Sequence, residues 1–312
     1  MLGDRVGALA AVDCGTNSTR LLVAGADGAV LDRQMRVTRL GEGVDATGRL
    51  AAGAVSRTLA VLADYRKTMD SLGVAAARLV ATSAVRDAAN GADFLRAAAE
   101  TTGVRAELLS GEEEGRLAYA GATDDLPPTA GDDVVLDIGG GSTELVVERA
   151  GVLGAVSLHL GCVRLTERYL RHDPPAAPEL AAVAAAIGSE LDRAVAELPA
   201  LGTLRPGSRL LGLAGTVSTL AMLDLGLDRY ERARVHHAVL DLATVSRWCE
   251  VLAAEPSGDR SRRAGMDPGR EDVIVGGAIV LREVMRRFGF DRCLVSEADI
   301  LDGLVLSLRT PA

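Results

Sequence analysis

A short pattern occurs twice in this chain of 312 residues and limits how the chain can fold. "VDCGTNSTRLLV" begins at Val12, and "LDIGGGSTELVV" begins at Leu136. Aligning the copies places Asp13 on Asp137 and Gly15 on Gly139, each 124 positions apart. In both copies an apolar segment ends in Asp, a turn of small residues follows, and a second apolar segment begins, which is typical of two antiparallel strands. The repeat predicts two halves with the same fold.

Each half is predicted to begin with antiparallel strands and to continue with helices. The strands are expected at residues 8–13, 20–25 and 29–37, and again at 134–137, 144–148 and 152–159. Apolar residues at helical spacing predict a helix over 51–72, and 112–122 is expected to form another. Asn90 is a candidate N-cap for the helix after it, and Ser296 with Asp299 resembles a capping box before a final helix.

These elements predict an α/β fold class, with two duplicated domains, mixed sheets flanked by helices, and an interdomain cleft. Segment 123–133 is rich in turn residues and charge, so it is the expected domain boundary. The predicted domains are residues 1–124 and 125–312.

The composition argues against several classes of protein. A net charge of −9 argues against nonspecific DNA binding. No apolar run approaches the roughly 18 residues that a membrane-spanning helix requires. The N-terminus is a poor signal peptide, so we expect a cytoplasmic protein. The four cysteines form no CxxC pair and predict reduced or buried thiols rather than a structural zinc site.

The two turns are predicted to bind phosphate groups. Glycine lets backbone N–H groups approach a ligand closely, and Ser and Thr hydroxyls add further donors. A plain hairpin turn has no reason to keep an Asp at its start and Ser-Thr at its end. The pattern is neither a Rossmann nor a P-loop motif. The predicted phosphate ligands of the turns are Gly15, Thr16, Asn17, Ser18, Gly139, Gly140, Gly141, Ser142 and Thr143.

A third segment, "AGTVSTL", is also predicted to bind an anion. It takes Gly215 and Thr216 from a strand to the N-terminus of a helix. Free N–H groups and the helix dipole favour negative charge there, although a plain Ser/Thr cap would have the same sequence.

Five segments together resemble one family: "VDCGTNST", "ATSAVRDA", "SGEEEGRLAYAG", "LDIGGGSTELVV" and "AGTVSTL". They are similar to the exopolyphosphatase and guanosine pentaphosphate phosphohydrolase (Ppx/GppA) family, in its short two-domain form. The resemblance covers nearly the whole chain and implies two actin-like (ribonuclease H-like) domains. It implies hydrolysis of the terminal phosphoanhydride bond of polyphosphate, or of the 5′ γ-phosphate of pppGpp, with Mg²⁺ as cofactor.

The resemblance also implies a general base and a metal site. Glu114 in "EEGRL" is the expected base that activates water, although acidic residues are also favoured in any first helical turn and Glu113 is its neighbour. Asp137 and Glu144 are expected to hold Mg²⁺, and Glu144 could hold a water molecule as a second catalytic carboxylate. Asp13 has either a related role or only braces the first turn.

Arginines near the turns are further candidates. Arg86 is the expected phosphate ligand after a short strand at 78–81, against the alternative of a surface salt bridge with Asp87. Arg20 follows the first turn and is a weaker candidate for the same role. Arg164 could also reach the cleft.

Several features are expected to be structural, or remain open. Adjacent side chains on a helix or strand point in different directions, so His236 and His237 are not expected to bind one metal. Gly276 and Gly277 fit either close helix packing or an approach of the backbone to a ligand.

The expected ligand is inorganic polyphosphate or pppGpp. No DNA or membrane partner is expected, and a homodimer is left open. The other classes considered are a small-molecule kinase of the same fold and a noncatalytic (p)ppGpp-binding sensor.

Overall fold

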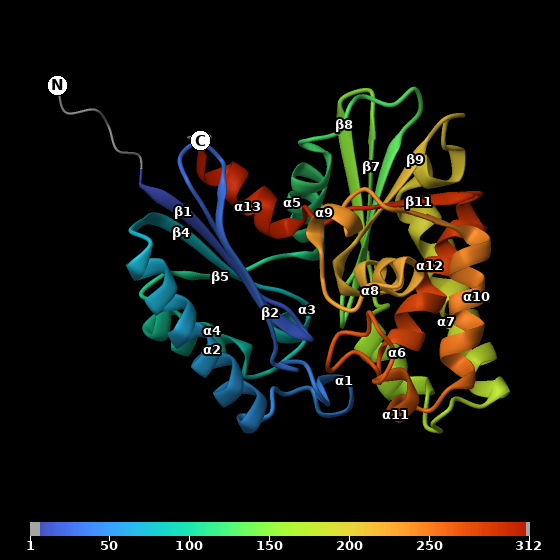
Figure 1. Ribbon diagram of the computed structural model, residues 1–312, viewed down its shortest axis with the longest axis horizontal. Coiled ribbons are helices and arrows are strands. Elements are labelled where there is room, and N and C mark those ends of the chain that lie inside the picture. Colours follow the sequence, from blue (N-terminus) through green and yellow to red (C-terminus); the bar gives the residue numbers. More distant parts are fainter. Residues whose placement is uncertain (1–6, 310–312) are drawn as a thin grey trace. The chain divides into compact units, whose positions relative to one another are not determined.

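The computed structural model describes residues 7–309, and their contacts divide the chain into two units (Figure 1). The first unit comprises the chain up to Gly121 and from Ile300 onward, and the second comprises Ala122–Asp299. The chain therefore passes into the second unit close to the boundary expected from segment 123–133. The last helix differs from expectation, because it packs on the first unit's strands rather than in the second domain.

The first unit contains a five-stranded sheet in the order β3-β2-β1-β4-β5. Strands β1, β2 and β3 are antiparallel neighbours, and β4 and β5 run parallel to β1. The strands are β1 (Ala8–Cys14), β2 (Ser18–Ala24), β3 (Val30–Val37), β4 (Val74–Ala81) and β5 (Ala106–Leu108). The helices are α1 (Val44–Thr47), α2 (Ala52–Ser71), α3 (Ser83–Arg86), α4 (Gly91–Thr102), α5 (Gly111–Thr123) and α13 (Ile300–Arg309).

Both faces of this sheet are covered, which explains why β1 is buried along its whole length. Ala10 and Val12 point into a core shared with α2 and α4, while Leu9 and Ala11 are also buried, and α13 lies along the opposite face (Figure 1). A strand buried on both faces must be apolar throughout, and the sequence "ALAAVDC" meets that requirement up to Asp13.

The second unit repeats this arrangement with one added strand. Its order is β10-β11-β9-β6-β7-β8, so β8-β7-β6-β9-β11 corresponds to the first sheet in both order and direction. The strands are β6 (Asp133–Ile138), β7 (Thr143–Arg149), β8 (Val152–Leu158), β9 (Arg209–Leu213), β10 (Val239–Asp241) and β11 (Arg292–Val295). The helices are α6 (Cys162–Tyr169), α7 (Ala177–Glu197), α8 (Ala214–Leu225), α9 (Arg232–Val235), α10 (Leu242–Ala254), α11 (Ser257–Arg260) and α12 (Ile274–Phe288), with a 3₁₀ helix at Pro199–Thr203.

The second core is built around helix α12, which contacts α6, α7, α8 and α10. Gly276 and Gly277 lie on this helix, and they show why it packs so closely. A Cβ atom on Gly277 would lie 2.3 Å from Thr216 Oγ1, and one on Gly276 would lie 3.2 Å from the carbonyl oxygen of Cys162. Close helix packing is therefore sufficient to explain the two glycines.

The structure confirms the predicted fold class and corrects some local details. Two mixed sheets flanked by helices are present, and the four cysteines are free and buried. Asn90 does precede α4, but its side chain bonds the backbone of Leu50 instead of capping the helix. The final helix begins at Ile300, and Ser296 bonds Ala298 rather than forming the expected capping box. In the described part of the chain, no helix has the length and apolar character needed to cross a membrane.

Candidate active site

The two repeated turns have the same backbone geometry. In the first, the N–H group of Gly15 donates to the carbonyl oxygen of Ser18 over 3.0 Å; in the second, Gly139 donates to Ser142 over 3.0 Å. Each turn links the first two strands of its own sheet. The repeat seen in the sequence is thus a repeat of one folded loop.

In both loops the carbonyl oxygens are bound by the protein itself. The carbonyl of Thr16 accepts the N–H of Gly41, and that of Asn17 accepts two N–H groups from the segment after β3. In the second loop the carbonyls of Gly139 and Gly140 accept N–H groups from Cys162, Val163 and Arg164 at the start of α6.

The N–H groups on these loops are left available. Among residues 7–309, those of Thr16, Asn17, Gly140 and Gly141 donate no hydrogen bond. Successive backbone N–H groups of this kind form a concave site for an anion. Each unit therefore presents a loop suited to a phosphate group.

Close backbone contact holds each loop against the segment behind it. A Cβ atom on Gly161 would lie 2.2 Å from the carbonyl oxygen of Gly140, and one on Gly41 would lie 2.3 Å from Thr16 Cγ2. Glycine is therefore required at both positions because a Cβ atom has no room there, and not because of a left-handed backbone. Arg164 supports the second loop further, since its Nε donates to the carbonyl oxygen of Gly141 over 2.7 Å.

The Ser and Thr residues of the loops are mostly buried, and two of their hydroxyls bond the protein. Thr143 Oγ1 donates to the carbonyl oxygen of Leu160, and Thr19 Oγ1 lies 2.9 Å from Thr38 Oγ1. Thr143 thus helps to shape the loop. Ser142 is buried on the same loop, whereas Ser18 of the first loop is half-buried.

The strongest difference between the loops lies in the charged pair that flanks each one. Asp13 is opposite Arg20 on the paired strands β1 and β2, and Asp137 is opposite Glu144 on β6 and β7. Arg20 bonds Asp13 Oδ2 through Nε at 3.1 Å and Nη2 at 2.6 Å. The predicted phosphate ligand Arg20 is therefore engaged with the carboxylate beside it.

The second unit has two acidic residues at the equivalent positions. Asp137 is 6% exposed and Glu144 is 1% exposed. Directly opposed residues on antiparallel strands point to the same face of the sheet. Buried carboxylates need a cation or hydrogen bonds to remain charged, and Ser157 Oγ donates one to Glu144 Oε1 over 2.7 Å. The donor set of two carboxylate groups fits a hard divalent cation such as Mg²⁺.

Helix α5 carries three glutamates in its first turn, and their contacts separate them. Glu113 folds back to the N–H and hydroxyl groups of Ser110, at 2.9 and 2.8 Å, as in a capping box. Those hydrogen bonds lower the pKa of Glu113. Glu112 pairs with Arg116 one turn further on.

Glu114 is the glutamate that faces Arg86. Its side chain is only 12% exposed, and its Oε2 lies 3.6 Å from Arg86 Nη1. Arg86 also donates from Nη1 to the carbonyl oxygen of Leu109 over 2.9 Å, so its guanidinium has a defined position. Two sequence-predicted residues from α3 and α5 are thus brought together within the first unit.

The third predicted anion site contains a residue that the sequence did not indicate. Gly215 and Thr216 begin α8, directly after β9, whose Leu213 pairs with Asp137. A Cβ atom on Gly215 would lie 1.7 Å from Nη2 of Arg270, so this arginine lies directly against the glycine. Arg270 is 8% exposed. It comes from segment 258–272, which the sequence predicts to be a polar loop, and its contact with Gly215 distinguishes it from Arg260, the other buried arginine there.

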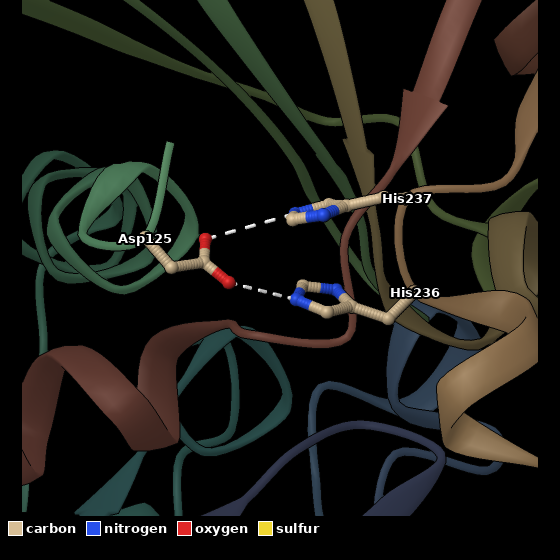
Figure 2. A group of neighbouring side chains, drawn as sticks. All are labelled: Asp125, His236 and His237. Atoms are coloured by element: carbon tan, nitrogen blue, oxygen red, sulfur yellow. Dashed lines mark hydrogen bonds and ion pairs between the residues drawn. The ribbon is translucent and has the colours of Figure 1, made fainter. Parts of the chain in front are cut away.

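The side chains of His236 and His237 do not point in different directions, as adjacent residues of a regular helix or strand would. Their rings stack with centroids 3.8 Å apart, and both face the carboxylate of Asp125 (Figure 2). The reason is a left-handed backbone at His237, where φ is 64°, so the pair belongs to neither a regular strand nor a helix.

Two ribonuclease H-like units, each with the same hairpin loop between its first two strands, define the class of proteins with the actin-like fold. Within that class, the chain belongs to the Ppx/GppA phosphatase family, whose model matches residues 22–310. It is an enzyme of that family, so the resemblance inferred from the five motifs is confirmed.

Individual relatives support this assignment along the whole chain. The chain is 40% identical to exopolyphosphatase 2 of Mycobacterium tuberculosis, covering 96% of this chain and 98% of that protein. Among solved structures, an exopolyphosphatase-like protein gives a TM-score of 0.89 at 34% identity, covering 97% and 98% of the two chains. The Ppx/GppA family member of Aquifex aeolicus gives 0.80 at 32% identity, covering 97% of each.

Proposed function

We propose that this phosphatase hydrolyses the terminal phosphoanhydride bond of inorganic polyphosphate. Support comes from the relatives named exopolyphosphatase and from a repeated loop suited to phosphate in each unit. A polymer of identical phosphate groups suits N–H donors that recognise charge and shape, because no base or sugar has to be read.

The single observation that carries the catalytic assignment is the position of Glu114. Glu112 and Glu113 are engaged within the first turn of α5, whereas Glu114 is mostly buried beside Arg86. We assign Glu114 as the base that orients a water molecule and accepts its proton as the oxygen attacks the terminal phosphorus. The bridging oxygen then leaves with the shortened chain. A positioned base of this kind contributes roughly 10²–10⁴ in rate.

Several groups bind phosphate in this proposal. The free N–H groups of Thr16, Asn17, Gly140 and Gly141 hold phosphate oxygens, and Arg86 adds charge beside the base. We also assign Arg270 to an anion at the start of α8, because it lies against Gly215. Phosphoryl transfer depends mainly on this kind of positioning and charge neutralisation.

Asp137 and Glu144 would hold Mg²⁺. The bound ion would neutralise charge on the phosphate oxygens. Ser157 keeps Glu144 oriented through its hydrogen bond to Oε1.

The test is phosphate release by the purified protein from short and long polyphosphate, with Mg²⁺ present or removed by EDTA. We expect Mg²⁺-dependent release without any acceptor molecule, which a kinase would not give. The same assay with pppGpp in place of polyphosphate tests whether pppGpp is the substrate instead. Tight pppGpp binding with no turnover of either substrate would instead identify a sensor and overturn the proposal.

A further inference from the structure

A second cluster of metal-binding side chains lies in the second unit, apart from the carboxylates of β6 and β7. Asp125, in the segment after α5, faces His236 and His237, which follow α9 (Figure 2). One oxygen or nitrogen from each residue lies within 4.8 Å of the others. Asp125 and His236 are 111 positions apart in the sequence. The fold thus brings three potential metal ligands together.

The backbone at His237 shows that this arrangement has a cost. Its φ of 64° is left-handed, which is unfavourable for a residue with a Cβ atom. The N–H group of His237 donates to the carbonyl of Val295 over 2.7 Å, which fixes the strained conformation. That conformation stacks the second ring on the first and directs its Nε2 toward Asp125. Residues held in this kind of backbone conformation cluster at functional sites.

The hydrogen bonds give the two histidines different roles. The backbone N–H of Glu297 donates to His236 Nδ1 over 3.0 Å, so the neutral ring carries its proton on Nε2. That Nε2–H donates to Asp125 Oδ2 over 2.9 Å. His236 therefore cannot bind a metal through Nε2, but it orients the carboxylate, as residues around metal ligands commonly do.

His237 and the other oxygen of Asp125 have the spacing that a metal ion requires. His237 Nε2 lies 3.6 Å from Asp125 Oδ1, longer than a hydrogen bond. Two ligands of a tetrahedral ion, each about 2.1 Å from it, lie ~3.4 Å apart.

We propose that His237 Nε2 and Asp125 Oδ1 bind a divalent transition-metal ion such as Zn²⁺, with water completing the coordination and His236 orienting the carboxylate. The ion would fasten the segment after α5 to the start of β10. Imidazole nitrogen favours Zn²⁺ over Mg²⁺ at this site, whereas the two carboxylates of β6 and β7 favour Mg²⁺.

The test measures Zn²⁺ binding to the full chain without polyphosphate, so it does not depend on the proposed activity. After removal of metals with EDTA, calorimetry is expected to show one Zn²⁺ per chain, and thermal unfolding is expected to shift upward with Zn²⁺. Asp125→Asn and His237→Gly should lose both effects. Asp137→Asn should retain them, because it changes only the carboxylate pair.

His237→Gly also separates the metal site from a structural role. Glycine tolerates the left-handed backbone, so this variant should unfold at a higher temperature than the wild type when no metal is present. The exposed His172→Gln serves as a matched control and should behave as the wild type in every measurement. No Zn²⁺ binding by the wild type, or unchanged binding by His237→Gly, would overturn the proposal.

Discussion

Asp137 and Glu144 lie directly opposite each other on β6 and β7, with both side chains buried. The equivalent positions in the first unit hold Asp13 and Arg20, which form an ion pair with a shortest N–O distance of 2.6 Å. At these positions one copy of the repeat has an acid opposite a base, and the other has two acids. This difference explains why a metal ion is expected at the second loop rather than at the first.

Glu144→Arg would give the second unit the charge pattern of the first. The new guanidinium should pair with Asp137, so Mg²⁺ should no longer stabilise the protein and phosphate release should be lost. Thermal unfolding with and without Mg²⁺ checks the first effect, and the polyphosphate assay checks the second. Glu148→Arg makes the same change at an exposed site of the same strand and should keep both properties. A Glu144→Arg protein that still needs Mg²⁺ for activity would contradict the metal assignment.

Glu114→Gln should reduce phosphate release by roughly 10²–10⁴, because the amide cannot accept the proton from water. Unfolding temperature should change little, since the shape of the side chain is kept. Glu112→Gln, on the exposed side of the same helical turn, is the matched control and should remain active. Retention of more than about a tenth of normal activity by Glu114→Gln would rule out a general base at this position.

Gly161→Ala and Gly41→Ala should each disturb one phosphate loop. The added methyl would lie 2.2 Å from the carbonyl oxygen of Gly140 in one variant and 2.3 Å from Thr16 Cγ2 in the other. Overpacking of this kind costs typically 1–3 kcal/mol, and we expect KM for polyphosphate to rise in both variants. Gly188→Ala, on α7 with open space around it, should instead stabilise the protein by about 0.5–1 kcal/mol. Normal kinetics in both loop variants would show that the loops do not bind substrate.

Asp132 is expected to make the second unit sensitive to acid. Burial alone would raise its pKa, but hydrogen bonds from Arg149 and Arg205 outweigh burial and lower the pKa to about 2. Because the folded pKa lies below the unfolded value of about 3.9, the stabilisation is complete above pH 4 and is lost as the pH falls toward 2. The difference between the unfolded and folded pKa values corresponds to roughly 2–3 kcal/mol.

Asp132→Asn should therefore unfold at a lower temperature than the wild type at pH 7, with a much smaller gap near pH 2. Calorimetric scans of both proteins across this range measure the gap. An equal difference at both pH values would mean that the charge of Asp132 does not contribute. Asp133→Asn, which removes a carboxylate paired with Arg209, is a neighbouring comparison.

The sequence predicted those parts of the site that depend on local pattern. The two loops and the acidic residues beside them follow from apolar strands and small turn residues, so their repetition could be recognised directly. Glu114 required the resemblance to a family, because a first helical turn favours acidic residues in any protein. The contacts of Glu113 with Ser110 then distinguish the two neighbours in a way that the sequence does not.

Other features depend on contacts between distant residues. The burial of Arg270 against Gly215 requires a loop and a helix start to meet, and nothing in the local sequence predicts that meeting. The stacked rings of His236 and His237 depend on one unusual backbone angle, which histidine does not signal. The short strands β5, β10 and β11 were not predicted, because three or four residues carry too little periodicity.

The placement of helix α13 has a consequence for synthesis. Leu301, Leu304 and Val305 cover apolar residues of a sheet whose strands leave the ribosome before the whole of the second unit. Until Ile300–Arg309 has left the ribosome, that sheet surface is either exposed to water or bound by a chaperone. The first unit is therefore prone to aggregation during synthesis, because its strands are made first while its apolar sheet surface is covered last.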